Sequence, residues 1–138
     1  MLNGGIKPSG YLDFYNTLEN TITISEGGNS CGYVSYNKEK FWCGGHCYSL
    51  NNVCIDTNYL FHNLKYNQTK IMKLRIGTGL PNIQKKHLES YTLNIHNLDD
   101  QLILGKMFEK IYSRIKLEDK KQLFIIDLKK GLLQQMFI

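Results

Sequence analysis

The sequence WCGGHCYSLN, residues 42–51, decides our prediction of the fold. It contains the chain's only tryptophan, together with two glycines, a histidine and two of the four cysteines. Apolar or small side chains then recur at helical spacing as far as Leu64, which predicts a helix that opens at Cys47. The unpaired N–H groups in the first turn of a helix stabilise a thiolate, so a cysteine at this place is suited to nucleophilic chemistry.

The length and composition predict one folded domain. The chain has 138 residues with 42% hydrophobic content, and residues 1–10, which include three glycines and a proline, are expected to form a flexible arm. No apolar run reaches the roughly 18 residues that a membrane span needs, and the first residues lack the features of a secretory signal. We therefore expect a cytoplasmic protein, with delivery into a host cell as an alternative.

Charge is distributed unevenly along the chain. Residues 1–64 carry three Lys and Arg against five Asp and Glu, whereas residues 65–138 carry fourteen against seven. A basic half is typical of contact with nucleic acid or with an acidic partner. The lysines are scattered in pairs, however, which is typical of a solvated face, and no recognised nucleic-acid motif is present. The charge is therefore compatible with a nucleic-acid partner, but no sequence motif indicates one.

The periodicity of the remaining chain predicts an α+β domain. Alternating or continuous apolar residues predict five strands, at residues 21–24, 31–36, 71–76, 91–96 and 123–128. Asn97 is expected to cap a second helix that ends at residues 118–120. The predicted fold is an antiparallel sheet packed against the helix that opens at Cys47.

A nucleophilic cysteine needs a base beside it and a group that orients the base. Cys47 would be the nucleophile, and His87, which leads the 91–96 strand, would be the base, with His96 at the far end of that strand as the alternative base. Asp127, inside the last predicted strand, would orient the base. Each residue also has a simpler interpretation. Cys47 would be a buried structural thiol, His87 and His96 exposed imidazoles, and Asp127 a carboxylate on an edge strand.

Residues 44–51, GGHCYSLN, resemble the G-G-x-C-x-x-x-N motif of the arylamine N-acetyltransferases, which belong to the papain- and transglutaminase-like cysteine superfamily. The resemblance extends over residues 43–95. It implies a papain/transglutaminase-like fold with Cys47 as nucleophile and His87 as base. The arginine that precedes the two glycines in that family is replaced here by Cys43.

We therefore predict a small papain-like cysteine enzyme, a hydrolase or transferase. It would carry out acyl transfer, deamidation or amide hydrolysis through a thioester on Cys47, without a cofactor, as an effector on a protein substrate. One alternative is a non-enzymatic binding or assembly component, viral, ribosomal or from a phage, that uses the basic C-terminal half. The other is an interaction module stabilised by disulfides or by zinc, with the candidate ligands Cys31, Cys43, Cys47 and Cys54.

Overall fold

A three-stranded antiparallel sheet forms the centre of the computed structural model, which describes residues 1–137. The strand order is β2–β1–β3, with β1 (Thr21–Ser25) between β2 (Val34–Asn37) and β3 (Cys47–Ser49). A short 3-10 turn, η1 (Gly28–Ser30), joins the first two strands. The hairpin predicted at residues 21–36 is confirmed, because the β-branched alternation of β1 places Ile22 and Ile24 in the core.

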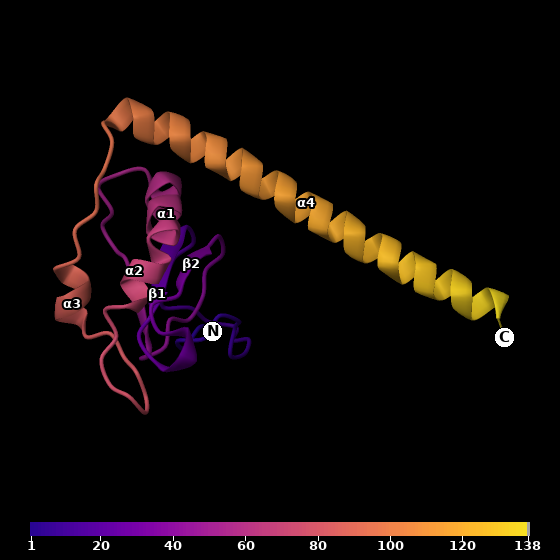
Figure 1. Cartoon of the computed structure of the whole chain (residues 1–138), viewed down its shortest axis with the longest axis horizontal. Coiled ribbons are helices and arrows are strands. Elements are labelled where there is room, and N and C mark those ends of the chain that lie inside the picture. Colours follow the sequence, from indigo (N-terminus) through magenta and orange to yellow (C-terminus); the bar gives the residue numbers. More distant parts are fainter. Residues whose placement is uncertain (138) are drawn as a thin grey trace.

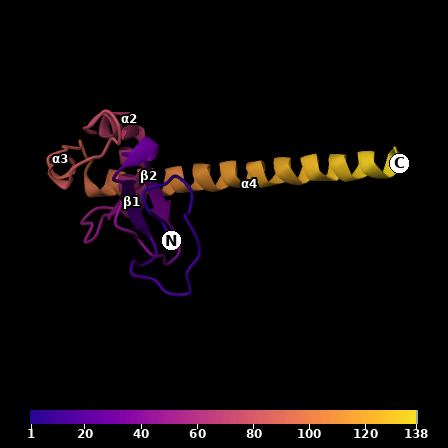
Figure 2. The same cartoon turned by 90° about the horizontal axis from the view of Figure 1, so that it is seen from below.

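Four helices follow the sheet (Figures 1 and 2). They are α1 (Thr57–Tyr66), α2 (Gln68–Met72), α3 (Lys85–Glu89) and α4 (Leu98–Met136). The helix α1 lies against β1 and β2, and its apolar face completes the core of the globular part. That core consists of Ile22, Ile24, Cys31, Val34, Leu60, Phe61, Leu64, Ile71 and Ile83.

The helix α4 is 39 residues long and projects far beyond the rest of the chain (Figure 1). The cap predicted at Asn97 is confirmed, because its side chain accepts a hydrogen bond from the backbone N–H of Asp100 at 3.0 Å. Only the first part of α4 packs on the globular part, chiefly against α1.

The predicted helix end at residues 118–120 and the predicted strand at residues 123–128 are wrong, because α4 runs through both segments. Neither segment contains glycine or proline. Glu118 forms ion pairs along the helix with Arg114 at 3.1 Å and Lys121 at 3.2 Å, which support the helical geometry. The run LFIIDL is apolar at successive positions, so it lacks the two-residue period of a half-buried strand.

The predicted helix at Cys47 is also wrong, and with it the predicted packing of the sheet. Cys47 begins β3 and pairs with Ser25, and α1 begins only at Thr57, where the Asp56 carboxylate accepts the Tyr59 N–H at 2.7 Å. The strand predicted at residues 71–76 overlaps α2, and residues 91–96 form no regular element. Side chains take up the backbone groups of that second segment: the Asn63 amide donates to the Asn94 carbonyl at 2.9 Å.

Residues 1–10 are bound to the globular part, unlike the flexible arm that we expected. The Leu2 N–H donates to the Trp42 carbonyl at 2.8 Å, and the Gly44 N–H donates to the Leu2 carbonyl at 2.7 Å. A Cβ atom on Gly44 would collide with the side chain of Asn3. Gly44 therefore serves the close approach of the N-terminal segment.

Candidate functional site

The two cysteines of the central sequence interact with each other. The Cys43 Sγ donates to the Cys47 carbonyl at 3.3 Å, and both residues are half-buried. The neighbouring Cys43 side chain lowers the pKa of Cys47 to about 7, against the opposing effect of burial. The same contact, with burial, raises the pKa of Cys43 well above its ordinary value. Cys47 is therefore the more ionisable thiol of the pair.

The other predicted catalytic residues lie on separate elements. His96 precedes α4, and its Nδ1 is 2.7 Å from the Tyr59 hydroxyl, while His87 lies within α3. Asp127 lies on the projecting part of α4. Among residues 1–137, no hydrogen bond joins Cys47 to any of these three. The structure does not bring the predicted set together, and its catalytic roles stay predictions from the sequence.

The histidine that does lie near the cysteines has a different partner. His46 Nδ1 is 3.4 Å from Glu26 Oε2, at the edge of the sheet. The zinc alternative lacks a cluster, because no group of three or more metal-binding side chains occurs in the part of the chain that the structure describes. Cys31 is buried and donates to the Glu26 carbonyl, whereas Cys54 is exposed. All four cysteines are free thiols, so no disulfide stabilises the fold.

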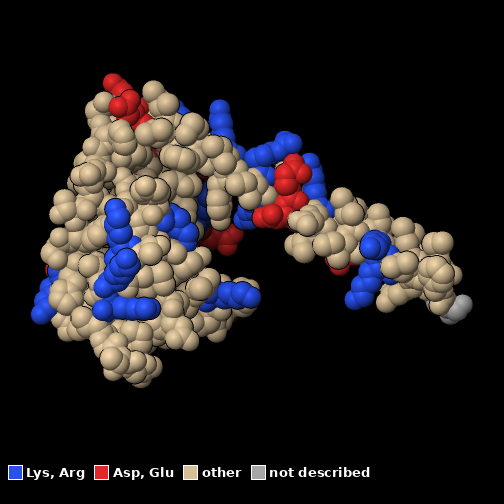
Figure 3. Space-filling view, viewed as in Figure 1, with Lys and Arg blue, Asp and Glu red and all other residues tan. Residues whose placement is uncertain are grey.

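A basic face lies elsewhere, over α2, α3 and the loop between them. Residues 57–88 contain six Lys and Arg and no Asp or Glu. Five of these basic side chains are exposed: Lys70, Lys73, Arg75, Lys85 and Lys86. We call these five residues the basic face. Figure 3 shows several basic side chains gathered on the globular part of the chain.

The sixth basic residue, Lys65, is structural. Its Nζ donates to the Val34 carbonyl at 2.9 Å and lies 3.8 Å from the centre of the Tyr33 ring. Lys85 pairs with Glu89 at 3.6 Å, while the other members of the basic face form no salt bridge within residues 1–137. Their charges are thus available to anions in solution.

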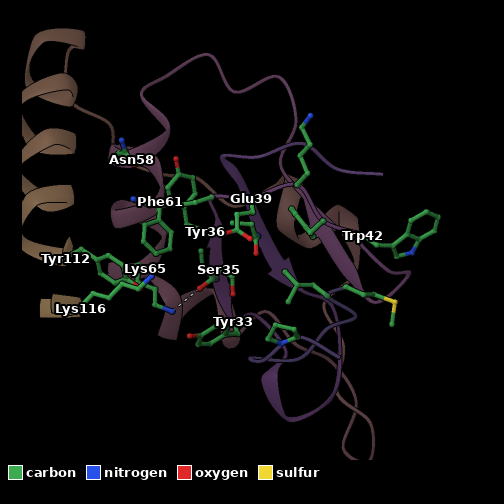
Figure 4. A pocket seen from close by; sticks show the side chains of 18 of the residues that line it. Tyr33, Ser35, Tyr36, Glu39, Trp42, Asn58, Phe61, Lys65, Tyr112 and Lys116 are labelled. Atoms are coloured by element: carbon green, nitrogen blue, oxygen red, sulfur yellow. Dashed lines mark hydrogen bonds between the residues drawn. The ribbon is translucent and has the colours of Figure 1, made fainter. Parts of the chain in front are cut away.

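Two hollows flank α1. The first lies between β2, α1 and α4, and Figure 4 shows aromatic and basic side chains around it, including Tyr36, Tyr112 and Lys116. The second lies between α1 and residues 91–96, next to the basic face, and its lining is rich in side chains that form hydrogen bonds: Tyr59, His62, Asn63, Tyr66, Asn67, Lys70, Tyr91, Thr92, Asn94 and His96. Amide, hydroxyl and basic groups beside exposed lysines suit a polar, anionic polymer.

Comparison with known proteins identifies the family. A family model described as "Type I restriction modification DNA specificity domain" matches residues 2–125. The chain belongs to this family. As a type I specificity domain, it contains both the basic face and most of α4 within the matched residues.

The individual relatives agree with the family. A putative type I specificity subunit of Mycoplasma genitalium is 39% identical over 90 residues, which cover 63% of this chain and 23% of that protein. A putative type I specificity subunit of Mycoplasma pneumoniae is 36% identical over 103 residues, which cover 72% of this chain and 27% of that protein. This specificity domain therefore spans about a quarter of the length of the curated relatives that it matches.

A solved structure supports the same family. The crystal structure of a type I restriction-modification system S subunit from M. genitalium matches with a TM-score of 0.77 and 32% identity. The match covers 93% of this chain and 34% of that chain. The similarity thus extends over both the globular part and the long helix.

These matches correct the predicted identity. The papain/transglutaminase-like fold and the cysteine hydrolase or transferase that it implied are wrong, because the family model and the structural match both indicate a type I specificity domain. An effector on a protein substrate has no support. The non-enzymatic alternative agrees only loosely, because it named neither DNA specificity nor restriction-modification.

Sequence reasoning missed the basic face although a signal was present. A division of the charge at residue 64 cuts through the acid-free run at residues 57–88, in which much of the basic excess lies. A search for long segments without acidic residues would have found it.

Proposed function

We propose that the chain is the DNA-recognition part of a type I restriction-modification specificity subunit, and that the basic face contacts the phosphates of duplex DNA. The observation that carries the proposal is the exposure of five basic side chains within one acid-free segment, on one side of the globular part. Phosphate contacts of this kind supply most of the affinity for DNA and fix the orientation of the protein on the duplex. In this role the chain acts on cytoplasmic DNA, and delivery into a host cell has no support.

Charge substitutions test this role. We expect the triple variant Lys70→Gln, Lys73→Gln and Arg75→Gln to bind duplex DNA more weakly. The slope of log K against log salt should fall by up to about 0.9 for each phosphate contact removed. These side chains are exposed, so the substitutions should change the free energy of unfolding by less than about 0.5 kcal/mol each.

The matched control removes the same charge from α4. Lys120, Lys121 and Lys129 are exposed on its projecting part, and their change to Gln alters the net charge equally. Fluorescence anisotropy with labelled duplexes between about 50 and 200 mM salt measures both slopes. Equal losses in the two triple variants would contradict a localised DNA interface.

We also propose that α4 packs against helices of its partners in a type I enzyme, and we call α4 the helix-pairing arm. Beyond Tyr112 its apolar side chains are about half exposed or more, including Leu123, Phe124, Ile125 and Ile126. Successive helical residues point about 100° apart, so these four cover most of the circumference of the helix. Such a helix is stable in water only when neighbours cover it. No helix in residues 1–137 is long and apolar enough to cross a membrane.

Sedimentation velocity tests the pairing arm. Without its partner helices, the chain should self-associate through α4 at high micromolar concentration, and Ile126→Glu should reduce this association. Lys121→Glu, on the same part of the helix, is the polar control and should have little effect. A chain that stays monomeric while α4 remains helical by circular dichroism would contradict the proposed arm.

A further inference from the structure

The loop between α2 and α3 projects as a finger from the globular part, of which it forms the lowest point in Figure 1. Its base is closed by a pair of hydrogen bonds: the Ile76 N–H donates to the Asn82 carbonyl at 2.8 Å, and the Asn82 N–H donates to the Ile76 carbonyl at 3.0 Å. We call residues 77–81, GTGLP, the finger. Gly77 at its start has a φ of +92°, a conformation that favours glycine.

The base of the finger is fixed to the core. The Gly28 N–H donates to the Pro81 carbonyl at 2.9 Å, and the Ile83 N–H donates to the Glu26 carbonyl at 2.8 Å. The Ile83 side chain is completely buried in the core. Because both connections lead back to the β1–β2 hairpin, the finger is held in place before any ligand binds, and little ordering is needed on binding.

The tip of the finger is apolar. The Leu80 side chain is 89% exposed, the most exposed leucine of residues 1–137. A single exposed leucine needs no explanation by itself. The charges around this one distinguish it: Lys73 and Arg75 precede the finger, Lys85 and Lys86 follow it, and all four are exposed.

We infer that the finger enters a groove of duplex DNA and that Leu80 contacts the methyl group of a thymine. The inference rests on the proposed function, because the basic side chains on both sides of the finger would be bound to phosphates. Phosphate contacts fix the register and orientation of a protein on the duplex, and a segment that projects into the groove can then contact the base edges. In the major groove the thymine methyl is the apolar group of the base edges, and an apolar side chain recognises it.

The first experiment identifies the DNA sequence that the chain binds. The 138-residue chain is used to enrich short random-sequence duplexes, and the enriched motif is compared with that obtained with Leu80→Ala. We expect the variant to bind the selected duplex roughly tenfold more weakly, as for loss of a buried leucine side chain, with unchanged affinity for random duplex. Leu18→Ala, an equal truncation of an exposed leucine that precedes β1, should leave the motif unchanged.

The second experiment removes the methyl group from the DNA. Each thymine of the selected site is replaced in turn by deoxyuridine, which lacks the methyl group and keeps its hydrogen-bonding pattern. One replacement should weaken wild-type binding about fourfold, the equivalent of burying one methyl group, and should not weaken binding by Leu80→Ala. Sensitivity of the wild-type chain to deoxyuridine at one position, absent in Leu80→Ala, would be the direct signature of the contact.

The outcomes separate the two claims. If the wild-type chain does not bind duplex DNA at low salt, the proposed function fails and the finger's role fails with it. If the chain binds DNA but Leu80→Ala enriches the same motif with the same affinity, the finger's role is overturned while the proposed function stands. Binding without any enriched motif, or equal sensitivity of both proteins to every deoxyuridine, also overturns the contact with thymine.

Discussion

Gly105 allows α4 to lie directly against the start of α1. A Cβ atom at this position would overlap the Asp56 Oδ1 and would lie 3.2 Å from the Tyr59 nitrogen. Asp56 is the cap of α1, and its Oδ1 already accepts the Tyr59 N–H at 2.7 Å. Gly105→Ala therefore forces either the cap or the whole of α4 to move.

The expected change in the free energy of unfolding is the balance of one stabilising and two destabilising effects. Replacement of a glycine inside a helix by alanine stabilises the helix by about 1 kcal/mol. Overpacking costs about 1–3 kcal/mol, and loss of the cap hydrogen bond costs about 1 kcal/mol more. Gly105→Ala should thus lower the free energy of unfolding by about 1–3 kcal/mol. Gly131 provides the matched control, because it lies in the same helix with no atom within 4 Å of its added Cβ.

Urea unfolding followed by Trp42 fluorescence measures the globular part, and circular dichroism measures α4. With a slope near 2 kcal/mol per molar urea, Gly105→Ala should lower the fluorescence midpoint by about 1 M. Gly131→Ala should leave that midpoint unchanged and raise the helical signal, because its gain of about 1 kcal/mol acts on the projecting part of α4. A midpoint that is unchanged or higher in Gly105→Ala would refute the close approach of α4 to α1.

Three further results are expected. Cys47, whose pKa the Cys43 thiol lowers to about 7, should be alkylated by iodoacetamide faster than Cys43 or Cys31, and Cys43→Ala should move the pH–rate profile of Cys47 to higher pH. Mass spectrometry of the labelled peptides measures both effects, and equal rates at the three thiols would exclude an activated Cys47. Burial lowers the pKa of His62 below its ordinary value, so the unfolded chain binds more protons, and the free energy of unfolding should fall as pH decreases below about 6.5. His62→Phe should flatten this pH dependence, which urea midpoints across that range measure. An unchanged dependence in the variant would show that His62 does not cause it. Ile83→Ala should lower the free energy of unfolding by about 2–5 kcal/mol because the side chain is fully buried, and a loss below about 1 kcal/mol would contradict its place in the core.

Local sequence patterns predicted the elements that local interactions determine. The β1–β2 hairpin combines a clear two-residue alternation with a glycine-containing turn, and the cap at Asn97 requires only a side chain and the backbone of the next turn. Both were therefore visible in the sequence. The basic face was missed, although its signal, a long segment without acidic residues, is local in the sequence.

Elements that depend on distant partners could not be predicted in this way. Cys47 is in a strand because Ser25 pairs with it, and residues 91–96 are irregular because side chains of α1 hold their backbone. The two glycines belonged to the motif that predicted a nucleophile at Cys47, whereas Gly44 is required by the approach of Asn3. The same residue pattern thus fits two explanations, and only the position of the N-terminal segment distinguishes them.

The contact between α1 and α4 connects the two proposed functions of the chain. The first turns of α4 are held by specific contacts: Gln101 donates to the His96 carbonyl at 2.7 Å, and the His62 ring packs on Phe108 at 5.0 Å. The same α1 continues into α2, which carries Lys70 of the basic face. The direction of the projecting helix is therefore fixed relative to the surface that we propose binds DNA. It follows that Gly105→Ala, which forces α4 or the cap of α1 to move, should change the direction of α4 relative to the basic face while leaving the chain's own affinity for DNA unchanged.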